Sequence, residues 1–430
     1  MFEKKTSTPK VTRTVYLMRS KKLVMWTAKQ AEFNLKNTLT SGGPAIAWLV
    51  LLLLLSSLIL FSSTLHPIGD TPIYESYAVK MWQGLIPYRD FHIEYPPGVL
   101  PIIFLAQPVG LLIGSYALSY ALIVGVFIYL VLFDVYKRWG KRQVLWLSCL
   151  LLIFGRFVFF QLDIFSAVAL YFAIKSVNDH RYGHSAVLFA IATLIKGYPL
   201  VCLPAIILSL PKNKIRKYFR TLALVLAVGV LPFFVISPGG FWYSINYHAG
   251  RPLGIESGPA IIGFIERLFG QTIMSANSHG SVALIFPYSR LVGTMSSVAL
   301  VLSIALIAIF LFTQKAQKQL ATNCLAFLMA YIVLFKVGSV QFLLLPVMLA
   351  PLVINEIKQK SANSIWLRLL LIGIVEFVIV AKYSAWQTIN PQMTGGLLMI
   401  LRTLLEIELL IWILRITKST TLKKSRLSTY

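Results

Sequence analysis

The sequence has 430 residues, of which 57% are hydrophobic and only 13% are charged, and its formal net charge is +25. About a quarter of the residues of a soluble domain are charged, so most of this chain does not face water. Apolar runs such as residues 45–61 are long enough to cross the roughly 30 Å hydrocarbon core as helices, and they lack the alternation of barrel strands. The composition therefore predicts an all-α, polytopic membrane helical bundle.

The positive charge lies in short stretches between the apolar runs and not on one folded unit. This distribution follows the positive-inside rule, so the expected partner is the lipid bilayer and nucleic-acid binding is rejected. The three cysteines, Cys149, Cys202 and Cys324, all fall inside apolar runs without metal-ligand spacing. We therefore expect neither a disulfide framework nor a cysteine metal site.

Residues 1–44 form a basic segment, with nine Lys and Arg against two acids in its first 41 residues. It is too long and irregular for the charged region of a signal peptide, which favours a cytosolic tail. Within it, residues 21–39 mix Leu, Val, Trp and Phe with lysines. An amphipathic helix on the membrane surface and a disordered basic tail explain this part equally well.

Residues 45–415 contain about twelve predicted spans. They are 45–65, 115–136, 143–160, 163–177, 184–196, 198–210, 217–237, 289–313, 320–336, 340–355, 364–382 and 393–415. Nearly all basic loop residues then fall on one side, which places both termini in the cytosol, with residues 416–430 as a basic C-terminal tail. Residues 99–114 are apolar too, but counting them as a span would put Lys137 and Arg142 outside. We therefore expect a helix in or on the outer leaflet there.

Two outer loops are long, residues 66–114 and 237–288, and the first is expected to be helical. It holds four of the fifteen acids: Asp70, Glu75, Asp90 and Glu94. Asp70 follows the first span directly and precedes Thr71-Pro72, so it has the alternative of capping a helix. Aromatic rings and prolines surround these acids. A stiff acidic loop at the membrane boundary suits chemistry on a headgroup, with a carboxylate accepting a proton and a cation neutralising phosphate.

Several short motifs carry a resemblance to a known family. The first loop contains GLIPYRDF at 84–91 and EYPPG at 94–98, and KGYPL follows at 196–200. Tyr247-His248, the run RPL at 251–253 and Glu256-Ser257 come next, and Lys336, Ser339, Gln341 and Phe342 close the set, with Phe342 where the family usually has Tyr. Together they resemble the GT-C glycosyltransferases, and among these glycosyltransferase family 87, the polyprenyl-phosphate-mannose-dependent mannosyltransferases. The resemblance extends from about residue 66 to 350.

The resemblance implies a GT-C fold and inverting transfer of a sugar, with a bias to mannose, from a polyprenyl-phosphate donor to a glycan, lipid or protein acceptor. It implies that Asp70 is the catalytic base. One base and a phosphate leaving group suffice for this reaction, so we expect no metal and no cofactor. The side chains expected at the donor phosphate are Lys196, His248, Arg251 and Lys336. The side chains expected to bind substrate or support the site are Tyr74, Tyr77, Arg89, Asp90, Glu94, Asp163, Glu256 and Gln341. For Lys196, snorkelling to the interface is the alternative.

The predicted location is the plasma membrane, with the active site facing outward. A secondary transporter or a flippase of envelope precursors is the alternative function, since twelve spans suit these classes too. Transporters often show two similar halves around a site at the membrane midplane. We find neither a repeat nor a mid-span cluster of charges, which favours the enzyme. His180 and His184 have the i, i+4 spacing of a metal pair, but Gly183 between them favours a solvated loop.

Overall fold

The structure is a computed structural model that describes residues 70–314, 319–357, 359–383 and 393–427. The predicted N-terminal tail and the predicted first span, 45–65, lie outside the described residues. Helices make up most of the rest. They are α3 (Thr71–Trp82), α4 (Leu100–Ile113), α5 (Tyr116–Trp139), α6 (Lys141–Phe154), α7 (Arg156–Phe159), α8 (Asp163–Asn178), α9 (Tyr182–Ile195), α10 (Leu203–Ser209), α11 (Lys212–Ile236), α12 (Pro238–Ala249), α13 (Ile261–Leu268), α14 (Ser289–Thr313), α15 (Leu320–Leu334), α16 (Leu344–Glu356), α17 (Gln359–Tyr383) and α18 (Met393–Leu427).

Short 3₁₀ helices precede four of these elements, at Pro97–Val99, Tyr198–Cys202, Gly258–Ala260 and Val340–Leu343. Each predicted span beyond residue 115 coincides with a helix or a pair of helices. Among the described residues, four helices are long and apolar enough to cross a membrane: Tyr116–Trp139, Lys212–Ile236, Ser289–Thr313 and Asn363–Val380. A mostly helical chain with several candidate membrane spans is therefore confirmed, whereas the number twelve stays a prediction.

The outer surfaces of α11 and α14 face away from the protein. Only 6% of the apolar window of α11 and 22% of that of α14 are buried inside the structure. Exposed side chains such as Leu224, Val228 and Val301 cover these helices. Surface of this kind is stable only against hydrocarbon, so these two helices form lipid-facing walls.

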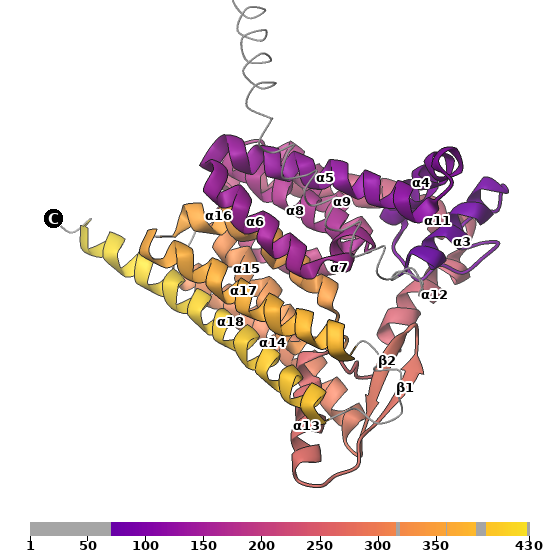
Figure 1. Cartoon of the computed structure of the whole chain (residues 1–430). Helices are drawn as coiled ribbons and strands as arrows, with labels where there is room; N and C mark the ends of the chain where they lie inside the picture. The colour runs from indigo at the N-terminus through magenta and orange to yellow at the C-terminus, as the bar shows by residue number, and fades with distance from the viewer. Residues whose placement is uncertain (1–69, 315–318, 358, 384–392, 428–430) are drawn as a thin grey trace, which may run out of the picture.

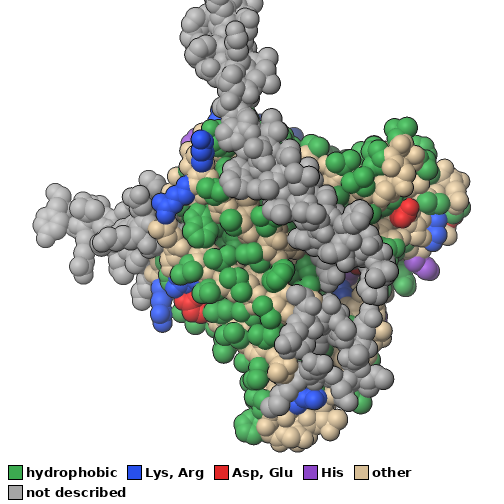
Figure 2. Space-filling view, in the orientation of Figure 1, with side chains coloured by type: hydrophobic (Ala, Val, Ile, Leu, Met, Phe, Trp, Pro, Cys, Tyr) green, Lys and Arg blue, Asp and Glu red, His purple; other side chains and the backbone are tan. Residues whose placement is uncertain are grey.

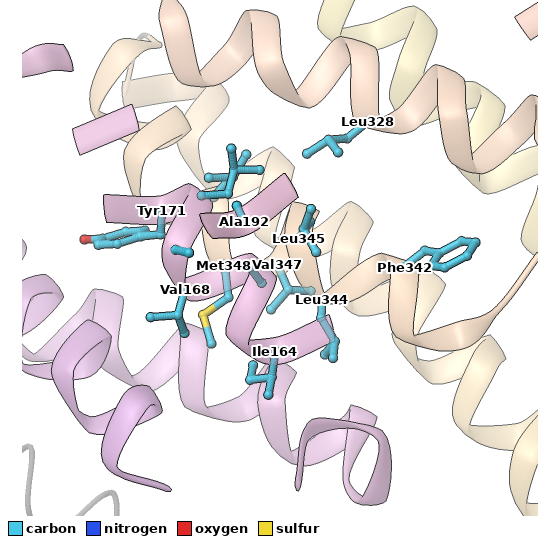
Figure 3. Packing of buried hydrophobic residues seen from close by; sticks show 14 of the residues in the cluster. Ile164, Val168, Tyr171, Ala192, Leu328, Phe342, Leu344, Leu345, Val347 and Met348 are labelled. Carbon is cyan, nitrogen blue, oxygen red and sulfur yellow. The ribbon is translucent and has the colours of Figure 1, made fainter. Parts of the chain in front are cut away.

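The core lies between α8, α15 and α16, whose residues are mostly buried, and one face of α9 packs against α8. Figure 3 shows Ile164 and Val168 of α8 beside Leu344, Val347 and Met348 of α16. The small Ala192 of α9 has no exposed surface, which suits close approach between helices. A second apolar cluster, separate from the first, joins α13, residues 273–286 and the ends of α17 and α18.

Two elements differ from the sequence-based expectation, and a third agrees with it. The all-α prediction is wrong in one place, because strands β1 (Met274–Ser278) and β2 (Ser281–Ile285) form an antiparallel hairpin in the second long loop. Helix α18 continues to Leu427, past the predicted end of the span at residue 415. The apolar stretch 99–114 does form a helix, α4, ending at Gly114 with φ of 75°, a left-handed conformation that glycine adopts without strain.

The bundle has two ends of different character. One end, here called the loop end, carries α3, α12 and the β1–β2 hairpin, at the right and lower right of Figure 1. The other end, here called the turn end, carries the short α5–α6, α8–α9 and α10–α11 connections. The ion pair between Arg138 and Asp179, 2.9 Å, joins two of these connections. Figure 2 shows Lys and Arg side chains along the left edge of the same view, away from α3 and α12.

Candidate functional site

Asp70 stands directly before α3 at the loop end. Its backbone carbonyl accepts hydrogen bonds from the N–H groups of Ile73 and Tyr74, but its carboxylate caps no helix N–H. Instead, the Tyr95 hydroxyl donates to Oδ2 at 3.1 Å, and the Tyr74 hydroxyl lies 3.4 Å from the same oxygen. Asp70 therefore stands at the N-cap position of α3 as the alternative expected, but its side chain does not cap the helix: tyrosines from two elements fix this carboxylate.

Tyr95 also connects Asp70 to a buried ion pair. The Lys196 ammonium lies 4.8 Å from the centre of the Tyr95 ring and 3.3 Å from Oδ2 of Asp163. Asp163 is completely buried at the start of α8, where the Tyr198 hydroxyl donates to its Oδ1 at 2.9 Å. Burial and the neighbouring Asp70 raise the pKa of Tyr95 well above its usual value, so its hydroxyl stays a donor. The snorkelling alternative for Lys196 is contradicted by this partner.

Glu94 is joined to this group of side chains by contacts with Tyr77 of α3 and His248 of α12. The Tyr77 hydroxyl donates to Glu94 Oε2, and Nε2 of His248 lies 2.6 Å from the Glu94 carbonyl oxygen. A carbonyl can only accept, so Nε2 carries the hydrogen in this contact. Burial lowers the pKa of His248 to about 4, which leaves the ring neutral at pH 7 with Nδ1 as an acceptor.

Arg251 follows α12 in the second long loop. It is partly buried, and among the described residues its Nε has no hydrogen-bond partner. The chain after it is held tightly, because the Gly254 N–H donates to the Lys336 carbonyl at 2.8 Å. A Cβ at Gly338 would lie 2.1 Å from the Glu256 carbonyl oxygen, so glycine is required for this approach. A rigid loop thus holds a guanidinium without a bonding partner at Nε, which is expensive unless a ligand provides one.

A single cavity of about 1050 Å³ brings these groups together. Seven of the predicted site residues line it: Asp70, Glu94, Lys196, His248, Arg251, Glu256 and Gln341. An apolar lining adjoins this polar part, with side chains of the α10 region and of α14: Leu200, Leu203, Ile207, Ile304 and Phe312. The cavity is therefore amphiphilic, with charge at the loop end and hydrocarbon side chains beside lipid-facing helices.

Six predicted residues do not line the cavity. Tyr74, Tyr77 and Asp163 lie behind it and hold Asp70, Glu94 and Lys196 in place, so they act as supports. Lys336 bonds the Ala249 carbonyl at 2.9 Å and is absent from the lining. The last two, Arg89 and Asp90, form a pair with each other at 2.8 Å on the exposed surface. For these last three residues, partners within the protein account for the side chain, and their roles toward a substrate stay predictions.

The polar lining residues that received no role from the sequence include Tyr95, Gln161, Tyr198 and Tyr247. Three of them lie inside the motifs EYPPG, KGYPL and Tyr247-His248, so motif membership was the available signal. Gln161 gives no such signal, and only its position beside the Tyr74 hydroxyl, 3.3 Å from Oε1, reveals it. Within the part of the chain that the structure describes, no three His, Cys, Asp or Glu side chains gather where they could hold a metal ion.

The fold and the cavity define a helical membrane protein with an amphiphilic binding site at one end of the bundle. No family model matches the chain, and no curated protein matches it. Among solved structures, the chain is similar to ArnT from Cupriavidus metallidurans in the apo state, with 15% sequence identity and a TM-score of 0.36. The match covers 88% of this chain and 75% of that one. The residues of the cavity therefore carry the functional conclusion.

Proposed function

We propose that this protein is a membrane glycosyltransferase that uses a sugar linked to a polyprenyl phosphate. The observation that carries the proposal is the shared cavity: the Asp70 carboxylate, the Lys196 ammonium and the Arg251 guanidinium line its polar part, and apolar side chains line the rest. A lipid-linked sugar phosphate has the same division into hydroxyls, a charged phosphate and a hydrocarbon chain. The motif resemblance to family 87 supports mannose as the sugar and the outer membrane face as the location.

The reaction proceeds by one displacement. The acceptor hydroxyl gives its proton to the Asp70 carboxylate while its oxygen forms a bond to the anomeric carbon. The bond between that carbon and the phosphate oxygen breaks, and polyprenyl phosphate leaves with the electron pair. Attack opposite the leaving group inverts the anomeric configuration. Tyr95 keeps Asp70 oriented through its hydroxyl, 3.1 Å from Oδ2.

The two cations serve the phosphate. Arg251 offers a planar fork to two phosphate oxygens, and Lys196 contributes a point charge whose position is set by Asp163. His248 was expected to donate to the phosphate, but its Nε2 hydrogen faces the Glu94 carbonyl and its ring is neutral at pH 7. We therefore assign its Nδ1 to a substrate hydroxyl, together with Glu94, Glu256 and Gln341.

The test compares two carboxylates of the same segment. Asp70→Asn and Asp70→Ala are assayed in membranes with labelled polyprenyl-phosphate-mannose, and both should lose at least about 100-fold in transfer. Glu75→Gln is the matched control, since Glu75 is exposed on α3 and does not line the cavity. Full transfer by both Asp70 variants at normal protein levels would remove Asp70 as the base.

The same assay separates the enzyme from the alternative of a transporter or flippase. Wild-type protein in vesicles should attach the labelled sugar to an acceptor. If it instead moves intact polyprenyl-phosphate sugar between leaflets and forms no glycosidic bond, the alternative is correct.

A further inference from the structure

The turn end of the bundle contains a second cavity, separate from the first. It has a volume of about 320 Å³ and lies between the α8–α9 turn and the beginning of α11. Its lining consists of His180, Arg181, Tyr182, Gly183, His184, Lys214, Lys217 and Tyr218. Lys196 directly follows the fourteen residues of α9, so this cavity lies about 21 Å along that helix from the first site.

No acid lines this cavity. Its three permanent cations are Arg181, Lys214 and Lys217, which are exposed and make no ion pair with any described residue. The acid nearest in sequence, Asp179, pairs with Arg138 and Lys175. Three positive charges therefore converge on one hollow without a counter-charge from the described part of the chain.

The backbone adds to this positive potential. Helices α9 and α11 both begin at the cavity, and both lack a side-chain cap and an acid in the first turn. A neighbouring helix at the same end is treated differently: Glu356 accepts hydrogen bonds from the first N–H groups of α15 at Ala321 and Thr322, each at 2.8 Å. Helix N-termini attract anions, and of these three helices only α15 receives a carboxylate from the described residues.

Two tyrosines and two histidines complete the lining. The Tyr182 hydroxyl lies 3.0 Å from Nδ1 of His180, whose backbone has a left-handed φ of 60°. The Tyr218 hydroxyl, on a buried side chain, lies 3.5 Å from Ser185 Oγ. These groups add hydrogen-bonding capacity beside the three cations.

We propose that this cavity binds a phosphate group through Arg181, Lys214, Lys217 and the N-termini of α9 and α11. The proposal is independent of the glycosyltransferase function, because it shares no residue with the first cavity. Such a phosphate has two possible sources, a soluble phosphate ion and the headgroup of an anionic lipid. The lipid source has a structural basis, since α11 continues from the cavity into a lipid-facing wall.

The test uses the full-length protein in nanodiscs and a matched pair of double variants. Lys214→Gln/Lys217→Gln removes two charges from the cavity, and Arg216→Gln/Arg220→Gln removes two exposed charges from the same stretch outside it. In neutral phosphatidylcholine discs, the unfolding midpoint is titrated with inorganic phosphate against chloride of equal ionic strength. In a second arm, phosphatidic acid replaces part of the phosphatidylcholine.

The apparent affinity for phosphate, read from the shift of the unfolding midpoint, should fall at least about tenfold in the cavity variant and stay unchanged in the control variant. If inorganic phosphate produces it, the ligand is a soluble phosphate group; if only phosphatidic acid does, the ligand is a lipid headgroup. If neither arm stabilises the protein, or if both double variants respond alike, the proposal is overturned. These basic residues would then serve membrane orientation alone.

Discussion

The buried pair between Asp163 and Lys196 gives the sharpest test of how the first site is held. Asp163→Asn keeps the shape of the side chain and the hydrogen bond from the Tyr198 hydroxyl, but removes the negative charge 3.3 Å from the Lys196 ammonium. Lys196→Met removes the cation and leaves a carboxylate with no exposed surface. The two single variants and the double variant form a thermodynamic cycle.

The magnitude follows from distance and burial. At 3.3 Å and an effective dielectric constant of about 20, the attraction is about 5 kcal/mol before desolvation. Desolvation of both ions cancels most of this gain, but loss of one partner from a buried pair costs about 3–5 kcal/mol. The Lys196 side chain is 15% exposed, so the ammonium can be hydrated and Asp163→Asn should cost about 3 kcal/mol. Lys196→Met should cost about 5 kcal/mol, because Asp163 has no exposed surface.

The assay is the free energy of unfolding in detergent micelles titrated with a denaturing detergent. The double variant should be far more stable than the sum of the single losses suggests, with a coupling energy of about 3 kcal/mol. If the two losses add within about 0.5 kcal/mol, the residues are not coupled and the pairing is wrong.

Three further outcomes are expected. The pKa of His248 is about 4, below the usual 6.5, so the free energy of unfolding should be constant above pH 6.5 and fall between pH 6.5 and 4. His248→Gln should reduce this fall when unfolding midpoints are measured against pH. An unchanged acid slope in the variant would contradict the prediction. Tyr95→Phe keeps the ring over Lys196 but loses the hydrogen bond to Asp70, so the transfer rate should fall about tenfold at normal protein levels; an unchanged rate argues against orientation by this hydroxyl. Gly338→Ala should destabilise by about 2 kcal/mol or more, whereas Gly239→Ala, with no atom within 4 Å of its Cβ, should cost far less in the same unfolding assay.

The sequence by itself determined where the helices lie. Long apolar runs predict helices because a membrane leaves backbone N–H and C=O groups no partner outside the segment. For this reason α5, α11 and α14 coincide with predicted spans. The concentration of acids in one loop also drew attention to Asp70 and Glu94, which line one cavity, since charge in an apolar chain is rare enough to stand out. It drew attention equally to Asp90, which does not line that cavity.

Tertiary structure decided which charged residues meet. Lys336 matched a family motif yet bonds the Ala249 carbonyl, while Lys196 pairs with Asp163, 33 positions earlier in the chain. Partners of this kind depend on how helices pack, and packing directions are not encoded in the hydrophobic pattern of a single span. The β1–β2 hairpin escaped prediction, and only the fold shows that Leu253 and Ile255, from outside the hairpin, form backbone hydrogen bonds with β2. The sequence therefore determined where the helices lie and which polar side chains are available, and only the fold determined which of these side chains share a cavity.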